Sequence, residues 1–277
     1  SVERGRLLCA LTLDAGVRPI DAVLHARVAG ADGTDLLSAR RDVALAAGEN
    51  ELTWTLSVDG PPLWWPHSLG AQPLCTVALD VEVGDEVSDT RITRTAFREV
   101  RGHGWHFAVN GERMFLKGAN HGPTNVALAD ATSGDVRGDV DLAIGANLDF
   151  LRVHAHVARS ELYDAADERG LLLWQDLPLK WGYARGVRKQ AGRQARRMVD
   201  LLAHHPSVFL WCAHNAPVAY DREPGEPWAR GARLKLAATT FLPTWTKEVL
   251  DTSVARAISR RDQTRPTIRH SGAFSLY

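Results

Sequence analysis

The residue pattern of this chain changes once, near residue 97, and the change restricts the chain to few folds. Before it, apolar and polar residues alternate in short runs separated by turns rich in Gly and Pro. After it, continuous apolar runs alternate with helical stretches. Alternation with period two indicates antiparallel strands, and strand–helix alternation indicates a parallel sheet covered by helices. The pattern therefore predicts two domains, residues 1–97 and 98–277.

The first domain is predicted to be a β-sandwich of immunoglobulin-like size. Turns are expected at 29–33 and 59–62, where Gly, Asp and Pro gather. Several short strands with this turn spacing are typical of an immunoglobulin-like sandwich. The strands are expected at Arg6–Leu13, Asp21–Val28, Asn50–Val58 and Leu74–Val83.

The second domain is predicted to be an α/β TIM-type barrel that is incomplete. Its strands are expected at Phe115–Asn120, Leu148–His154, Leu171–Leu177, Val208–Ala213 and Thr267–Ser271. Its helices are expected at about 134–145, 160–169, 186–202 and 246–261. About five strands fit, whereas a complete eight-stranded barrel typically needs about 250 residues. We therefore expect the chain to be truncated at both ends, and the rest of its own barrel to be a partner segment.

Composition excludes several classes of function. Lys+Arg and Asp+Glu both number 33, so the chain lacks the positive charge typical of a nucleic-acid-binding protein. No run approaches the roughly 20 apolar residues of a membrane span. The three cysteines are too scattered for a disulfide framework or a zinc site. The opening residues SVERG carry no signal-peptide pattern, which favours a cytoplasmic location. No cofactor is expected.

Polar residues follow the apolar part of every predicted parallel strand. In a barrel, residues at the carboxyl ends of the strands face the active site. A rim of this kind predicts a pocket for a polar ligand. The spacing of His154 and His156 suits a metal, but no third ligand accompanies the pair, so no metal site is predicted. The polar ends are Asn120-His121, Arg152 with His154 and His156, Gln175-Asp176, His214-Asn215 and Arg269-His270.

Four blocks of sequence together resemble glycoside hydrolase family 2, and its β-mannosidase-like branch more than its galactosidases. Leu63–Leu74 (LWWPHSLGAQPL) is similar to a strand pair of the sandwich that precedes the barrel. The other three are similar to the first four barrel strands with their connections. They are FREV followed by FAVNGERMFLKGANH, LRVH followed by ELYDAADERGLLLWQDL, and AHHPSVFLWCAHNAP.

The resemblance implies a retaining exo-β-glycosidase that uses two Glu residues, one as nucleophile and one as general acid/base. The substrate would be a β-linked saccharide. The resemblance assigns Asn215 to binding of the sugar 2-hydroxyl. Further residues are assigned to substrate binding, namely Arg152, Trp174, Asp176, His121 and His154. His121 stands where mannosidases tend to have Trp, and residues 154–156 replace a Trp-Gly-Gly run, which puts mannose specificity in doubt.

The chemistry departs from the family at the acid/base position, which holds Ala216. A methyl group carries no proton, and the strand that normally supplies the nucleophile lies beyond the fifth. Glu223 and Glu226 are alternative acids, although solvated loop charges are the better explanation of both. Two functions therefore remain open. One is a family 2 glycosidase in partial or inactivated form, and the other is a non-catalytic carbohydrate-binding protein or scaffold.

Overall fold

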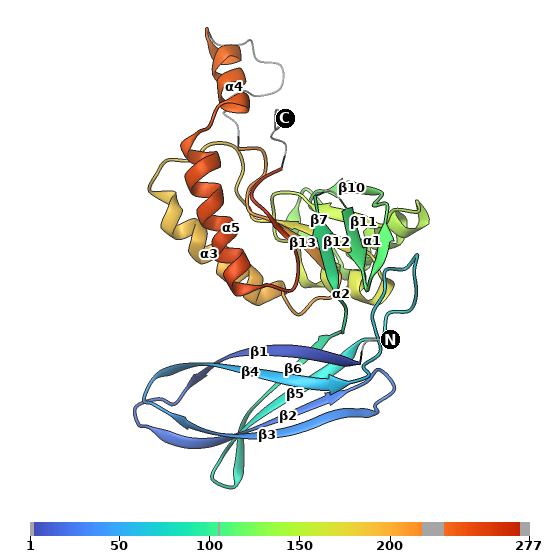
Figure 1. The fold of residues 1–277 in the computed structure, drawn as a ribbon, viewed down its shortest axis with the longest axis vertical. Coiled ribbons are helices and arrows are strands. Elements are labelled where there is room, and N and C mark those ends of the chain that lie inside the picture. The colour runs from blue at the N-terminus through green and yellow to red at the C-terminus, as the bar shows by residue number, and fades with distance from the viewer. Residues whose placement is uncertain (1–2, 105, 218–229, 272–277) are drawn as a thin grey trace. The chain divides into compact units, whose positions relative to one another are not determined.

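The structure, a computed structural model, describes residues 3–104, 106–217 and 230–271 (Figure 1). By its internal contacts the chain divides into two compact units. The first comprises Ser1–Trp65, Leu69–Arg98 and His204–Pro206, and the second comprises Pro66–Ser68, Glu99–Ala203 and Ser207–Tyr277.

The first unit consists of two antiparallel sheets. One pairs β1 (Arg4–Asp14) with β4 (Glu49–Asp59), and the other has the order β3-β2-β5-β6. The remaining strands are β2 (Ile20–Ala29), β3 (Asp35–Leu45), β5 (Cys75–Val83) and β6 (Glu86–Thr95). Alternate residues from both sheets, including Val28, Leu56 and Val77, form one hydrophobic cluster. The expected antiparallel strands are therefore present, and β3 and β6 join them.

The second unit is built on a five-stranded parallel sheet with the order β10-β11-β12-β13-β14. The strands are β10 (Gly118–His121), β11 (Phe150–Val153), β12 (Leu172–Asp176), β13 (Val208–Cys212) and β14 (Thr267–Ile268). The partial parallel sheet expected from the sequence is thus present. Its first strand starts three residues later than predicted, since Phe115 lies outside the sheet and is exposed.

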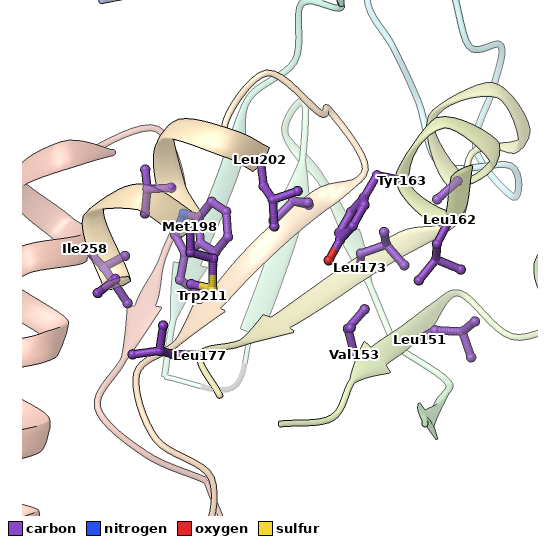
Figure 2. Packing of buried hydrophobic residues seen from close by; sticks show 14 of the residues in the cluster. Leu151, Val153, Leu162, Tyr163, Leu173, Leu177, Met198, Leu202, Trp211 and Ile258 are labelled. Carbon is purple, nitrogen blue, oxygen red and sulfur yellow. The ribbon is translucent and has the colours of Figure 1, made fainter. Parts of the chain in front are cut away.

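Helices cover one face of this sheet and form the main core with it. Alternate strand residues such as Leu151, Val153 and Leu173 point toward Leu162 and Tyr163 of α2 (Ser160–Arg169), as Figure 2 shows. Farther along the sheet, Trp211 packs among Met198, Leu202 and Ile258 of the neighbouring helices (Figure 2). Along each strand, side chains that face the helices therefore alternate with side chains on the other face of the sheet, as the pleat requires.

Local signals explain where the helices begin and end. A capping box between Thr132 and Asp135 starts α1 (Ser133–Gly145), and Gly170, at φ 75°, ends α2 in the left-handed conformation. The other helices are α3 (Val187–Leu202), α4 (Ala232–Phe241), the π-helical turn η2 (Thr246–Leu250), α5 (Asp251–Arg261) and the 3-10 turn η1 (Leu128–Asp130). Among the described residues, no helix has the length and apolar content needed to cross a membrane.

A small antiparallel sheet precedes the parallel one and was not expected from the sequence. It comprises β7 (Val100–His103), β8 (His106–Val109) and β9 (Glu112–Met114). Phe107 of β8 makes an edge-to-face contact with Phe209 of β13, at a centroid distance of 5.5 Å. The hairpin sheet thereby packs against the face of the parallel sheet that lies opposite the helices.

Candidate functional site

The carboxyl ends of the parallel strands bring some of the predicted polar residues together. Arg152 lies opposite Trp174 in the register of β11 and β12, and Asn120 of β10 lies opposite Arg152. Beyond β13 and β14, Asn215 and Ser271 form an isolated parallel bridge. The strand ends therefore supply residues from all five strands of this sheet to one region.

A buried ion pair between Arg152 and Asp176 lies at the centre of this region. Arg152 Nη2 donates to Asp176 Oδ2 at 2.7 Å, and Arg152 Nε lies 3.1 and 3.2 Å from the two carboxylate oxygens. The Asp176 side chain is fully buried, and that of Arg152 is 14% exposed. The Trp174 indole also donates to Asp176 Oδ1 at 2.9 Å, and the Ala155 amide donates to Oδ2 at 3.1 Å. These donors satisfy the carboxylate without a solvent contact.

The same arginine orients Asn215. Arg152 Nη2 donates to Asn215 Oδ1 at 2.8 Å and also contacts the Ser271 hydroxyl oxygen. Because guanidinium only donates, the oxygen of the amide must face Arg152. The amide nitrogen then donates to His154 Nε2 at 2.9 Å, so this ring nitrogen is an acceptor. Burial, followed by the nearby Arg152 charge, lowers the pKa of His154, which agrees with a neutral ring.

Two alanines beside this network have left-handed backbone conformations. Ala155 has φ 58° and Ala216 has φ 45°. Such conformations cost an L-residue roughly 1–2 kcal/mol. The Ala155 amide binds Asp176, and the Ala216 amide donates to the Ser271 carbonyl at 3.0 Å. Strained residues of this kind gather at functional sites, so their positions mark this region as a candidate site.

Trp174 forms an aromatic wall next to the charged pair. The Arg152 guanidinium carbon lies 4.8 Å from the Trp174 ring centroid, within cation–π range. The ring also stacks on Phe150 at a centroid distance of 6.3 Å. The half-buried indole is therefore held by contacts on its face and at its nitrogen.

His121 lies beside the network and belongs to a pair of histidines. Its Nε2 contacts Asp139 Oδ2 at 3.0 Å, and its ring stacks on His156 at a centroid distance of 6.1 Å. His156 Nδ1 contacts the His154 carbonyl at 3.1 Å. Burial lowers the pKa of His156. Each of the two histidine rings is therefore held in place by a contact through one of its ring nitrogens.

Two predicted polar ends point elsewhere, and one member of the network was missed. His214 and His270 contact the two oxygens of the buried Asp251 carboxylate through their Nδ1 atoms, at 2.7 and 2.8 Å. Arg269 is exposed and lies 4.0 Å from Glu248. Ser271, two residues farther along, supplies the contact to Arg152 because the chain beyond β14 bridges to Asn215. The predicted strand end at Ser271 was the available signal.

Ala216 lies at the edge of the network and contributes only its backbone. Its amide hydrogen bond to Ser271 holds the chain after Asn215 against the chain after β14. The alternative acids Glu223 and Glu226 lie outside the described residues. Among the described residues, Asp176 is the one carboxylate in the hydrogen-bond network of Arg152 and Asn215.

Sequence comparison finds β-mannosidases over most of the chain. No protein-family model matches it. Beta-mannosidase A of Emericella nidulans is 33% identical over 189 residues, which cover 58% of this chain and 20% of that protein. Beta-mannosidase A of Aspergillus niger is 29% identical over 247 residues, which cover 76% of this chain and 26% of that protein. The chain thus spans about a fifth to a quarter of the length of these relatives.

Solved structures share the fold over nearly the whole chain. Beta-D-mannosidase from Dictyoglomus thermophilum superposes with a TM-score of 0.77 and 23% identity, covering 98% of this chain and 33% of that one. A glycosyl hydrolase family 2 member from Bacteroides cellulosilyticus superposes with a TM-score of 0.75 and 18% identity, covering 96% and 34%. The sequence matches confirm the resemblance to β-mannosidases over part of their length, and the chain shares its fold with a solved β-mannosidase and a solved glycoside hydrolase family 2 member.

Proposed function

We propose that this chain carries the sugar-binding part of a retaining exo-β-glycosidase of the β-mannosidase type. In this proposal the first unit is an immunoglobulin-like sandwich and the second is the first part of a TIM-type barrel. The ligand is a β-linked saccharide, bound at the carboxyl ends of β11, β12 and β13. Ala216 occupies the acid/base position, and the nucleophile comes from a segment outside this chain.

The observation that carries the proposal is the network of Arg152, Asp176 and Asn215. Its parts are held rigid by one another, as a site that must discriminate hydroxyl positions requires. Arg152 and Asn215 bring N–H donors together in one cluster, and the Asn215 amide is fixed by its hydrogen bond to His154 Nε2. Trp174 adds an aromatic face of the kind on which sugar rings stack, beside the partly exposed guanidinium.

The second candidate function is a non-catalytic carbohydrate-binding protein. Ala216 favours it, since general acid catalysis typically contributes about 10²–10⁴-fold and a methyl group contributes none. Both candidates use the same network to bind sugar. They differ in whether a carboxylate acts at position 216 in the parent protein.

A binding experiment tests what the two candidates share. Methyl β-mannoside, β-glucoside and β-galactoside would be titrated into the chain and followed by calorimetry or ligand-observed NMR. We expect saturable binding of at least one glycoside, and a loss of about ten-fold or more in affinity for Asn215→Ala, equivalent to about 1.4 kcal/mol. Asn125→Ala, at an exposed position of the same unit, is the matched control and should bind as the wild type does. Equal affinity for both variants would remove Asn215 from the site.

A further inference from the structure

The helices of the second unit separate into a basic pair and an acidic pair. Helices α3 and α5 together hold eight Lys or Arg and two Asp, a formal charge of +6. Helices α1 and α2 together hold seven Asp or Glu and two Arg, a formal charge of −5. Helix α3 packs against α5 and α1 packs against α2, so the charges of each pair lie on neighbouring helices. The zero net charge of the chain therefore conceals two opposite charged faces.

The basic face is defined by the exposed residues of α3 and α5. Lys189, Arg193 and Arg197 follow one another at four-residue spacing on α3, where like charges destabilise a helix. Among the residues that the structure describes, Lys189, Arg196 and Arg197 form no ion pair. The basic face comprises Arg188, Lys189, Arg193, Arg196, Arg197, Arg256, Arg260 and Arg261.

The position of these charges on α3 is unfavourable for the isolated chain. The first turn of α3 contains Arg188 and Lys189, has no acidic residue and has no side-chain cap. Cations at a helix N-terminus oppose the helix dipole. The apolar side of the helix, including Ala195 and Val199, is buried in the core, so the basic face is not one half of a membrane-inserting surface. An anionic partner would relieve both kinds of repulsion.

The acidic face is defined by the exposed and half-exposed acids of α1 and α2. Ion pairs with arginine, Arg137 to Glu168, Arg169 to Asp141 and Arg159 to Glu161, engage half of its six acids. The acidic face comprises Asp135, Asp139, Asp141, Glu161, Asp164 and Glu168. Its six acids carry charge opposite in sign to that of the eight Lys and Arg residues of the basic face.

We propose that the basic face binds the acidic face of a second copy of this chain. Because this chain carries an acidic face as well as a basic face, a second copy supplies the anionic partner without a foreign polyanion. Copies with no net charge do not repel one another at long range. Because the two contacting faces are different, the contact is head-to-tail. A dimer of this kind still has one basic face and one acidic face available for further copies. Association therefore extends beyond a dimer as concentration rises.

Sedimentation velocity across salt concentrations tests the proposal. At about 20 mM NaCl the weight-average sedimentation coefficient should increase with protein concentration, and at about 500 mM NaCl the chain should sediment as a monomer, because salt screens exposed charges. Association that strengthens with salt would indicate apolar aggregation and would overturn the proposal. A chain that is monomeric at both salt concentrations would overturn it as well.

A charge-exchange experiment identifies the two faces. The basic-face variant is Arg193→Glu, Arg196→Glu and Arg197→Glu, and the acidic-face variant is Asp135→Lys, Asp141→Lys and Glu168→Lys. Each should be monomeric alone at low salt, and an equimolar mixture of the two should associate. The control variant Arg18→Glu, Arg40→Glu and Arg91→Glu makes the same change in net charge on exposed residues of the first unit. It should associate less than the wild type but more than the basic-face variant.

Circular dichroism melts confirm that each variant folds before it is compared. Folded variants whose mixture stays monomeric would show that the two faces do not bind each other. Loss of association in the control to the same extent as in the basic-face variant would show that net charge alone governs it. Either result would overturn the proposal.

Discussion

Asp176 is the residue on which the polar network depends. It is fully buried and accepts hydrogen bonds from Arg152, Trp174 and the Ala155 amide. Asp176→Asn removes the charge that balances Arg152 and places amide hydrogens opposite donors. Breaking a buried ion pair typically costs about 3–5 kcal/mol, so we expect a loss of about 3 kcal/mol in the free energy of unfolding. Urea titration measures it. Asp59→Asn, which breaks the exposed pair with Arg4, should change it by less than about 1 kcal/mol. Equal effects would mean that the Arg152 pair is solvated.

His154 and His156 make stability depend on pH. Burial lowers the pKa of both rings in the folded chain, so the unfolded chain binds protons more readily as the pH falls below about 6.5. Their contribution to stability is therefore complete above that pH and is lost at lower pH. The double variant His154→Gln and His156→Gln should show a smaller fall in melting temperature between pH 7.5 and 5.0. A double variant with the wild-type slope would contradict the assignment.

At the scale of elements, β10 is held beside β11 by a close contact that requires glycine. A Cβ added at Gly118 would lie 2.2 Å from Phe150 Cε1. The Phe150 ring cannot move freely, because it stacks on Trp174 and meets Phe209 edge-on at a centroid distance of 5.8 Å. Gly118→Ala should therefore destabilise the chain by about 1–3 kcal/mol, the usual cost of overpacking. Gly122→Ala, where an added Cβ meets nothing within 4 Å, is the matched control in a thermal or urea melt. Similar melts for the two variants would show that β10 adjusts without cost.

Elements with a buried face could be predicted from the sequence, and elements without one could not. The strand at Val208–Cys212 is buried at every position, and the helix Ser160–Arg169 has a buried face and a Gly170 stop. Strand β6 has no buried residue in its burial pattern, so its sequence EVSDTRITRT offers no apolar alternation, although it pairs fully with β5. A strand that pairs through its backbone and has no buried face shows no apolar alternation in its sequence.

The site was predictable to the extent that a strand end fixes a residue's position. Arg152, Asp176 and Asn215 were expected at one rim. In the structure Arg152 donates hydrogen bonds to both Asp176 and Asn215. The direction of a side chain after the strand has ended is set by long-range contacts. Ser271 reaches Arg152 across 119 residues, and Asp251 draws His214 and His270 to itself. Neither contact has a local sequence signal.

At the scale of the whole molecule, the proposed chemistry needs two carboxylates from separate segments. Retaining hydrolysis places them roughly 5–5.5 Å apart, one on each side of the bond that breaks. Among the described residues the network holds only Asp176, whose oxygens are occupied by Arg152, Trp174 and the Ala155 amide. A carboxylate introduced at position 216 would therefore supply an acid without a nucleophile.

We accordingly expect Ala216→Glu alone to release no nitrophenol from an aryl β-mannoside above the rate of the Ala216→Gln control. In a longer chain that provides the second carboxylate, the same change should raise the rate by about 10²–10⁴-fold on substrates with poor leaving groups. Aryl glycosides need little protonation of the leaving oxygen, so they should gain much less. Equal gains on both classes of substrate would show that residue 216 does not donate the proton. Turnover by Ala216→Glu in the present chain would show instead that the nucleophile already lies within these 277 residues.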